Sequence, residues 1–99
     1  MDNNKPFRNL IDILNTVIHI IKSSETDVAW SSYKTVEEAV IDLTDHIDRL
    51  AQNDLSRRWD LTVLFAPTGP LQEISLHSGW GKQFLELAAQ FDAAMRNIG

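Results

Sequence analysis

The segment 6–22 constrains the fold more than any other part of the chain. Its polar residues recur every three to four positions, which places them on one narrow stripe of a helix. Nine apolar residues cover most of the remaining surface: Phe7, Leu10, Ile11, Ile13, Leu14, Val17, Ile18, Ile20 and Ile21. An ordinary surface helix carries a narrower apolar stripe. We therefore expect this helix to be central in its own domain or shared with a second chain.

A second helix is predicted over residues 36–52. Thr35 followed by Glu38 matches a capping box, in which each side chain serves the backbone N–H of the other residue. A regular apolar stripe runs along one face and acidic residues occupy the opposite face, among them Glu37, Glu38, Asp42, Asp45 and Asp48. We expect this helix to pack against the first one as an antiparallel pair.

The residues that follow suggest β-structure. Segments 59–66 and 71–77 flank a turn at 67–70 with Pro67 and Gly69 at positions typical of a type I turn, which predicts a β-hairpin. A four-residue loop puts Leu61, Val63 and Phe65 on the inner face together with apolar residues of the second strand, namely Ile74 and Leu76. A third short strand near 28–32 is possible, and a last helix is expected after Ser78 as its N-cap. The predicted fold class is α+β, with the hairpin and the last helix closing one core.

Length and composition limit the classes of protein. The 99 residues predict a single domain, 1–99, and the absence of cysteine excludes disulfides and thiolate metal sites. The start of the chain is polar, and apolar runs stay far below the roughly 18 residues that span a bilayer, so we expect a cytoplasmic protein without a membrane partner. The net charge is −5 and the basic residues are scattered. Nucleic acid is therefore not an expected partner, whereas a basic protein is.

A small-ligand site is one hypothesis, at the junction of the hairpin and the last helix. Glycines and free N–H groups where a strand becomes a helix can hold an anion, and the residues expected there are Asp60, Glu73, His77, Ser78, Trp80 and Lys82. The phosphate-binding loop pattern is not matched, because Gln83 follows Lys82 where that pattern has Ser or Thr. The simpler interpretation is a tight turn with Trp80 in the core and a hairpin face exposed to water.

A protein-binding surface is the other hypothesis about sites. Leu64 and Leu71 share the outer hairpin face near Pro67 and Pro70, which could form an apolar patch for a partner. Val17 lies in the middle of the wide apolar arc of the first helix, where a second copy of the chain could bind.

A metal site on the second helix is one interpretation of its acidic face. Asp42, Asp45 and His46 are one turn apart, but no second group of ligands is marked, and an exposed acidic face with an Asp45–Arg49 ion pair is the better interpretation. No metal or other cofactor is therefore expected.

Three functions remain open from the sequence. The first is a non-enzymatic interaction or regulatory module, expected to form a homodimer. The second is a ligand-binding protein or enzyme that uses the junction site. The third is an acidic inhibitor or antitoxin-like protein that binds a basic partner through the acidic face of the second helix.

Overall fold

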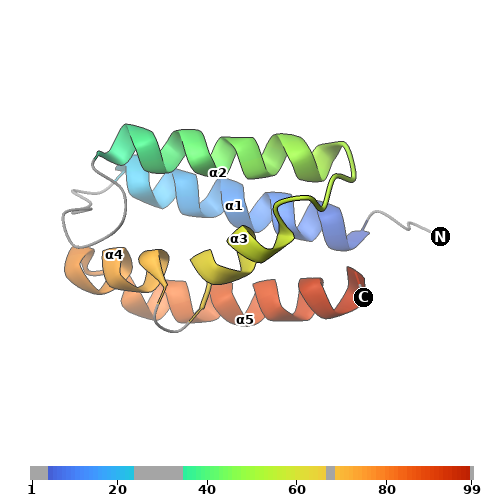
Figure 1. Cartoon of the computed structure of the whole chain (residues 1–99). Coiled ribbons are helices and arrows are strands. Elements are labelled where there is room, and N and C mark those ends of the chain that lie inside the picture. Colours follow the sequence, from blue (N-terminus) through green and yellow to red (C-terminus); the bar gives the residue numbers. More distant parts are fainter. Residues whose placement is uncertain (1–4, 24–34, 67–68, 99) are drawn as a thin grey trace.

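The structure is a computed structural model that describes residues 5–23, 35–66 and 69–98. The described residues form five α-helices and no strand: α1 (Lys5–Ser23), α2 (Val36–Ala51), α3 (Arg58–Leu64), α4 (Pro70–Ser78) and α5 (Gly81–Ile98) (Figure 1). The predicted α+β fold class is therefore wrong. The possible strand at 28–32 lies outside the described residues.

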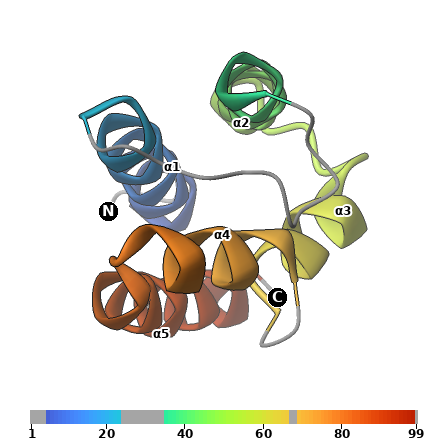
Figure 2. The same ribbon diagram turned by 90° about the vertical axis from the view of Figure 1, so that its left-hand side faces the viewer.

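Helix α1 is the centre of the bundle. It runs antiparallel to both α2 and α5 and packs against each of them (Figures 1 and 2). Leu10, Leu14, Val17 and Ile21 are fully or almost fully buried. The wide apolar arc of this helix is thus accounted for within one chain, because two helices cover it from different sides.

The residues predicted as a β-hairpin form the two short helices α3 and α4. Leu61, Leu64 and Phe65 are buried on α3 and at its end, while Val63, which the hairpin would have turned inward, is exposed. On α4 the buried positions are Leu71, Ile74 and Ser75, and Leu76 is exposed. Spacings of three and four residues are helical and not those of a strand. Burial of α4 against α5, and of α3 against α4, thus outweighs the strand preference of the β-branched and aromatic residues in this part of the chain.

The boundaries of α4 explain why a turn was predicted there. Gly69 is the N-cap and Pro70 is the first helical residue, a position where the missing N–H of proline costs nothing. The predicted turn includes residues 67 and 68, which lie outside the described residues. At the other end Gly79 has a positive φ of 85° and ends the helix, so Ser78 is the last residue of α4 and not the N-cap of α5.

Candidate functional site

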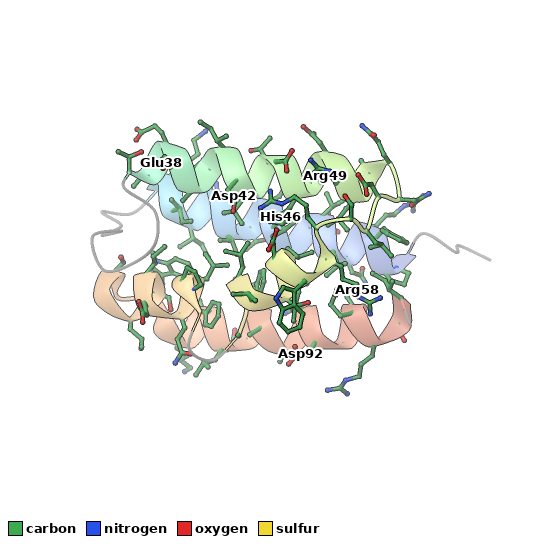
Figure 3. The ribbon with its side chains drawn as sticks, viewed as in Figure 1. Glu38, Asp42, His46, Arg49, Arg58 and Asp92 are labelled. Carbon is green, nitrogen blue, oxygen red and sulfur yellow. The ribbon has the colours of Figure 1, made fainter. Side chains whose placement is uncertain are left out.

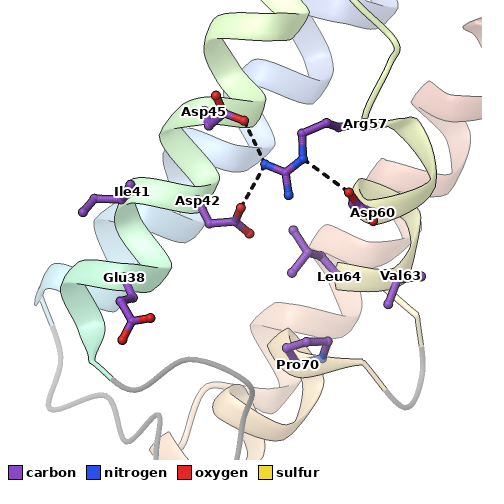
Figure 4. Close-up of a pocket in the computed structure, with 9 residues that line it drawn as sticks. All are labelled: Glu38, Ile41, Asp42, Asp45, Arg57, Asp60, Val63, Leu64 and Pro70. Atoms are coloured by element: carbon purple, nitrogen blue, oxygen red, sulfur yellow. Dashed lines mark hydrogen bonds and ion pairs between the residues drawn. The ribbon is translucent and has the colours of Figure 1, made fainter.

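An open groove lies between α2 and α3. It has a volume of about 790 Å³ and is lined by Glu38, Ile41, Asp42, Asp45, Arg57, Asp60, Val63, Leu64 and Pro70 (Figure 4). The closely packed helix pairs are α1–α2, α1–α5, α4–α5 and α3–α4, and the pair α2–α3 is not among them. The two walls of the groove are therefore joined in large part by side chains that cross it.

Arg57, the residue before α3, is the centre of this crossing. Its Nη1 donates hydrogen bonds to Asp42 Oδ1 at 3.0 Å and to Asp45 Oδ2 at 2.8 Å. Its Nε donates to Asp60 Oδ2 at 3.3 Å (Figure 4). Asp42 and Asp45 are three residues apart and hence on the same side of α2. One guanidinium is thus held by two carboxylates of α2 and one of α3.

A second arginine extends the network toward the end of α2. Arg49 Nε donates to Asp45 Oδ2 at 2.9 Å, which confirms the predicted i, i+4 pair. Its Nη1 donates to Asp54 Oδ2 at 3.2 Å and to Ser56 Oγ at 3.1 Å. Asp54 Oδ1 in turn accepts a hydrogen bond from the backbone N–H of Ser56 at 2.9 Å. These contacts fix the connection that leads into α3, and with it the position of Arg57.

Hydrogen bonds within the network stabilise the charged forms of its side chains. The hydrogen bonds from Arg57, and after it from Arg49, hold the pKa of Asp45 below its usual value. The pKa of Asp54 is lowered as well, chiefly by the backbone N–H of Ser56. The hydrogen bond to Asp45 raises the pKa of Arg57 further above its already high value. The hydrogen bond between Asp45 and Arg57 therefore stabilises the charged form of both side chains.

His46 lies beneath this network. Its side chain is 2% exposed, and its Nε2 is 3.9 Å from Asp42 Oδ2 and has no hydrogen-bond partner among the described residues (Figure 3). Burial, and after it the charge of Arg57, lowers the pKa of His46, so the imidazole is neutral at pH 7. The sequence held a signal for this burial that was missed: His46 is three residues after Leu43 and four before Leu50, which are both buried.

Exposed apolar side chains form the rim of the groove. Ile41 of α2 is 68% exposed, and Val63 of α3 is 40% exposed on the opposite wall. Trp59, one helical turn before Val63, is 75% exposed but is not among the residues that line the groove. Apolar side chains such as Ile41 and Val63 gain free energy if a partner covers them. We refer to Ile41 and Val63 as the apolar rim.

The structure does not place the predicted ligand site on one hairpin face. Asp60 lines the groove, but Glu73 and Lys82 are exposed on α4 and α5. Trp80 is buried in the core and its backbone N–H donates to Ser75 O at 2.9 Å, which makes this stretch a connection between two helices. Ser78 ends α4. The side chain of His77 lies outside the described part of the chain.

The residues predicted to bind a partner are placed differently as well. Leu64, Leu71 and Val17 are buried within the single chain, so they do not form the exposed patch and arc that the prediction assumed. Pro70 lines the groove, and Pro67 lies outside the described residues. No pattern in the sequence indicated that Arg57 would be the centre of a site.

The chemistry of the groove differs from that of a metal site. Asp42, Asp45 and His46 do come close, but the guanidinium of Arg57 bridges the two carboxylates. In residues 5–23, 35–66 and 69–98, no group of three or more potential ligands is arranged to hold a metal ion. None of the five described helices is long and apolar enough to cross a membrane. No protein-family model, curated protein or solved structure matches the chain.

Proposed function

We propose that the chain is a non-enzymatic interaction module that binds a positively charged, partly apolar segment of another protein in the α2–α3 groove. The observation that carries this proposal is the combination, in one open groove, of carboxylates on both walls and exposed apolar side chains along the rim.

Charge supports a basic partner. Among the lining residues the acidic ones are Glu38, Asp42, Asp45 and Asp60, against the single basic residue Arg57. The whole chain carries a net charge of −5. A surface of one sign attracts a partner of the opposite sign and increases its rate of association.

The apolar rim supports a protein partner over a small ion. Ile41 and Val63 gain free energy when an apolar surface of a partner covers them, and a small ion offers no such surface. An amphipathic helix with apolar residues on one side and basic residues beside them fits both features.

The groove gives less support to an enzyme. Its polar side chains are carboxylates, of which Asp42, Asp45 and Asp60 already bind Arg57. His46 is the nearest candidate for a base, and at 2% exposure it cannot reach a substrate in the groove. A general base must come within hydrogen-bond distance of the proton that it removes.

A second copy of the chain is a weaker candidate as the partner. The reason for expecting self-association was the apolar arc of α1, and α2 and α5 cover that arc in one chain. Through the α2–α3 groove, a second copy would bring the same carboxylates against the first, and like charges facing each other oppose binding.

Fluorescence anisotropy tests the proposal with a labelled 14-residue amphipathic peptide of leucine, alanine and arginine. We expect binding that weakens steeply between low and physiological salt, because screening shortens the range of the attraction. Asp60→Asn and Ile41→Ser should each weaken binding about tenfold, which corresponds to about 1.4 kcal/mol.

The matched control is Asp48→Asn, which removes one charge from an exposed position of α2 outside the groove lining. It should change the affinity by less than about twofold, as expected for a charge that the partner does not contact. The proposal is wrong if the peptide does not bind, or if Asp48→Asn weakens binding as much as Asp60→Asn does.

A further inference from the structure

We infer that Arg57 stands in for an arginine of the partner, whose guanidinium takes its place between Asp42 and Asp45. The guanidinium of Arg57 is bound in the groove by carboxylates of both walls, and this arrangement shows what kind of cation the groove holds. The inference rests on the proposed function and names the residue type that the groove recognises.

The carboxylates of the groove are placed for a planar cation with several donors. Asp42 and Asp45 accept from the same nitrogen of Arg57, and Asp60 accepts from another nitrogen on the side of α3. A guanidinium has five N–H donors in a fixed plane and can satisfy acceptors in separate directions. A lysine ammonium is a compact charge that cannot span the same set. The site therefore favours arginine over lysine.

Arg57 is placed so that a partner can displace it. Its side chain is 29% exposed and its carboxylate partners are 26%, 42% and 60% exposed, so the network faces water. Ion pairs exposed to water contribute little to stability. Helix α3 has only seven residues, no side-chain hydrogen bond caps its start, and it is not closely packed on α2. Exchange of one guanidinium for another keeps the same kinds of hydrogen bond and costs little.

His46 gives an independent indication that the resident side chain leaves the site incomplete. Its Nε2 faces Asp42 Oδ2 at 3.9 Å, beyond hydrogen-bond distance, and has no partner among the described residues. A buried polar atom without a partner costs free energy. The three hydrogen bonds that Arg57 donates to described residues all go to carboxylates. With Arg57 in this position, one buried polar atom next to the carboxylate of Asp42 therefore stays unpaired within the described part of the chain.

Competition by Arg57 lowers the apparent affinity for the partner. A ligand that binds only the open form of a site has its affinity reduced by the fraction of molecules in which the site is open. Removal of Arg57 should therefore increase the affinity for an arginine-containing segment. If Arg57 only holds α3 in place, its removal should weaken binding or leave it unchanged.

The test compares Arg57→Gln with Arg96→Gln, which removes the same charge from an exposed position in the last turn of α5. Anisotropy is measured at 0.15 M salt, where charges beyond about 8 Å are largely screened. The probes are the leucine, alanine and arginine peptide and two versions of it, one with lysine and one with neutral citrulline in place of arginine. We expect Arg57→Gln to bind the arginine peptide about tenfold more tightly than Arg96→Gln does, which corresponds to about 1.4 kcal/mol. The gain should be smaller for lysine and absent for citrulline.

Circular dichroism shows first whether each variant is folded. If Arg57→Gln does not fold, Arg57→Lys decides, because it keeps the charge while binding the three carboxylates less well. It should then bind the arginine peptide more tightly than the unchanged chain does. The inference is overturned if neither variant gains affinity, or if the gain is the same for arginine and citrulline. If the unchanged chain and both variants bind none of the basic peptides, the proposed function itself fails.

Discussion

The chemistry of single residues is most unusual at His46, a buried imidazole among charged groups. From α2 it is faced by Asp42 and Asp45, with Arg49 nearby. From the start of α3 it is faced by Arg57, Arg58 and Asp60, while α5 contributes only Met95. Burial has the largest effect on its pKa and lowers it, and Arg57 acts in the same direction. The folded chain therefore binds a proton at His46 less readily than the unfolded chain does.

This difference predicts that the fold loses stability as the pH falls below neutral. As the pH falls below about 6.5, the pKa of histidine in an unfolded chain, the unfolded state takes up a proton that the folded state refuses. The free energy of unfolding should fall by at most about 1.4 kcal/mol per pH unit until the folded pKa is reached, and this contribution then levels off. Urea unfolding between pH 8 and pH 5 measures the effect.

His46→Leu should remove this slope, because the side chain that replaces the imidazole does not titrate. His19→Gln is the matched control, since His19 is exposed on α1, and it should retain the slope. An unchanged slope in His46→Leu would show that another group causes the pH dependence.

Two glycines are needed for different physical reasons, and alanine substitutions separate them. A Cβ at Gly69 would overlap the backbone oxygen of Val63 at the end of α3, which cannot move alone. We expect Gly69→Ala to destabilise the fold by about 1–3 kcal/mol, the usual cost of overpacking. At Gly79 a Cβ meets nothing within 4 Å, and only the positive φ of 85° opposes it. Gly79→Ala should cost about 1–2 kcal/mol.

Unfolding in urea measures both substitutions. The two substitutions should differ in their effect on α3. Gly69→Ala must push α3 away from α4, which should alter the fluorescence of Trp59. Gly79→Ala should leave that signal unchanged. If Gly69→Ala is as stable as the unchanged chain, Gly69 does not lie as close to the backbone oxygen of Val63 as the structure places it.

At the scale of elements, the three long helices could be predicted from the sequence and the two short ones could not. Helices α1 and α2 begin and end within one residue of the predicted limits, and the last helix begins three residues after Ser78, as Gly81–Ile98. Their apolar periodicity extends over four turns or more, which makes it unambiguous. Helices α3 and α4 have seven and nine residues. These segments are too short to distinguish the apolar periodicity of a helix from that of a strand. Gly69 and Pro70, which start α4, are equally typical of a turn.

The candidate site could be predicted only in part, for a related reason. The acidic residues of α2 were identified as one face, because their spacing within a helix is fixed. Arg57 could not be placed, since its position opposite Asp42 and Asp45 depends on how α3 packs and not on local spacing. The 75% exposure of Trp59 on α3 likewise depends on how this helix packs and not on local spacing.

The start of α2 offers a prediction about an element as a whole. Thr35 has an extended backbone and its side chain accepts a hydrogen bond from Glu38 N at 3.1 Å. Thr35→Ala should therefore lower the free energy of unfolding by about 1 kcal/mol. Thr44→Ala is the control, because Thr44 is exposed within the helix and donates only to Val40 O at 2.7 Å. Equal effects of the two substitutions on urea unfolding would argue against the cap.

At the scale of the whole molecule, the architecture depends on α1 being covered from two sides. The sequence left open whether a second chain would cover part of its apolar arc. In the structure α2 and α5 do so, and Val17 in the middle of the arc is fully buried. The charged groove lies between α2 and α3, and none of its lining residues belongs to α1. The apolar arc of α1 and the proposed binding surface can therefore be altered independently of each other.

Val17→Asp tests this arrangement. An unpaired carboxylate in the core costs several kcal/mol, comparable with the total stability of about 5–15 kcal/mol for a domain. We expect the variant to lose its helical circular dichroism, whereas Ile41→Asp, at a residue of the apolar rim that is 68% exposed, should stay folded. Light scattering on both variants and the unchanged chain gives the mass in solution. If Val17→Asp stayed helical and only halved its mass, the arc of α1 would be an interface between two chains, and the assignment of α1 to the core of a single chain would be wrong.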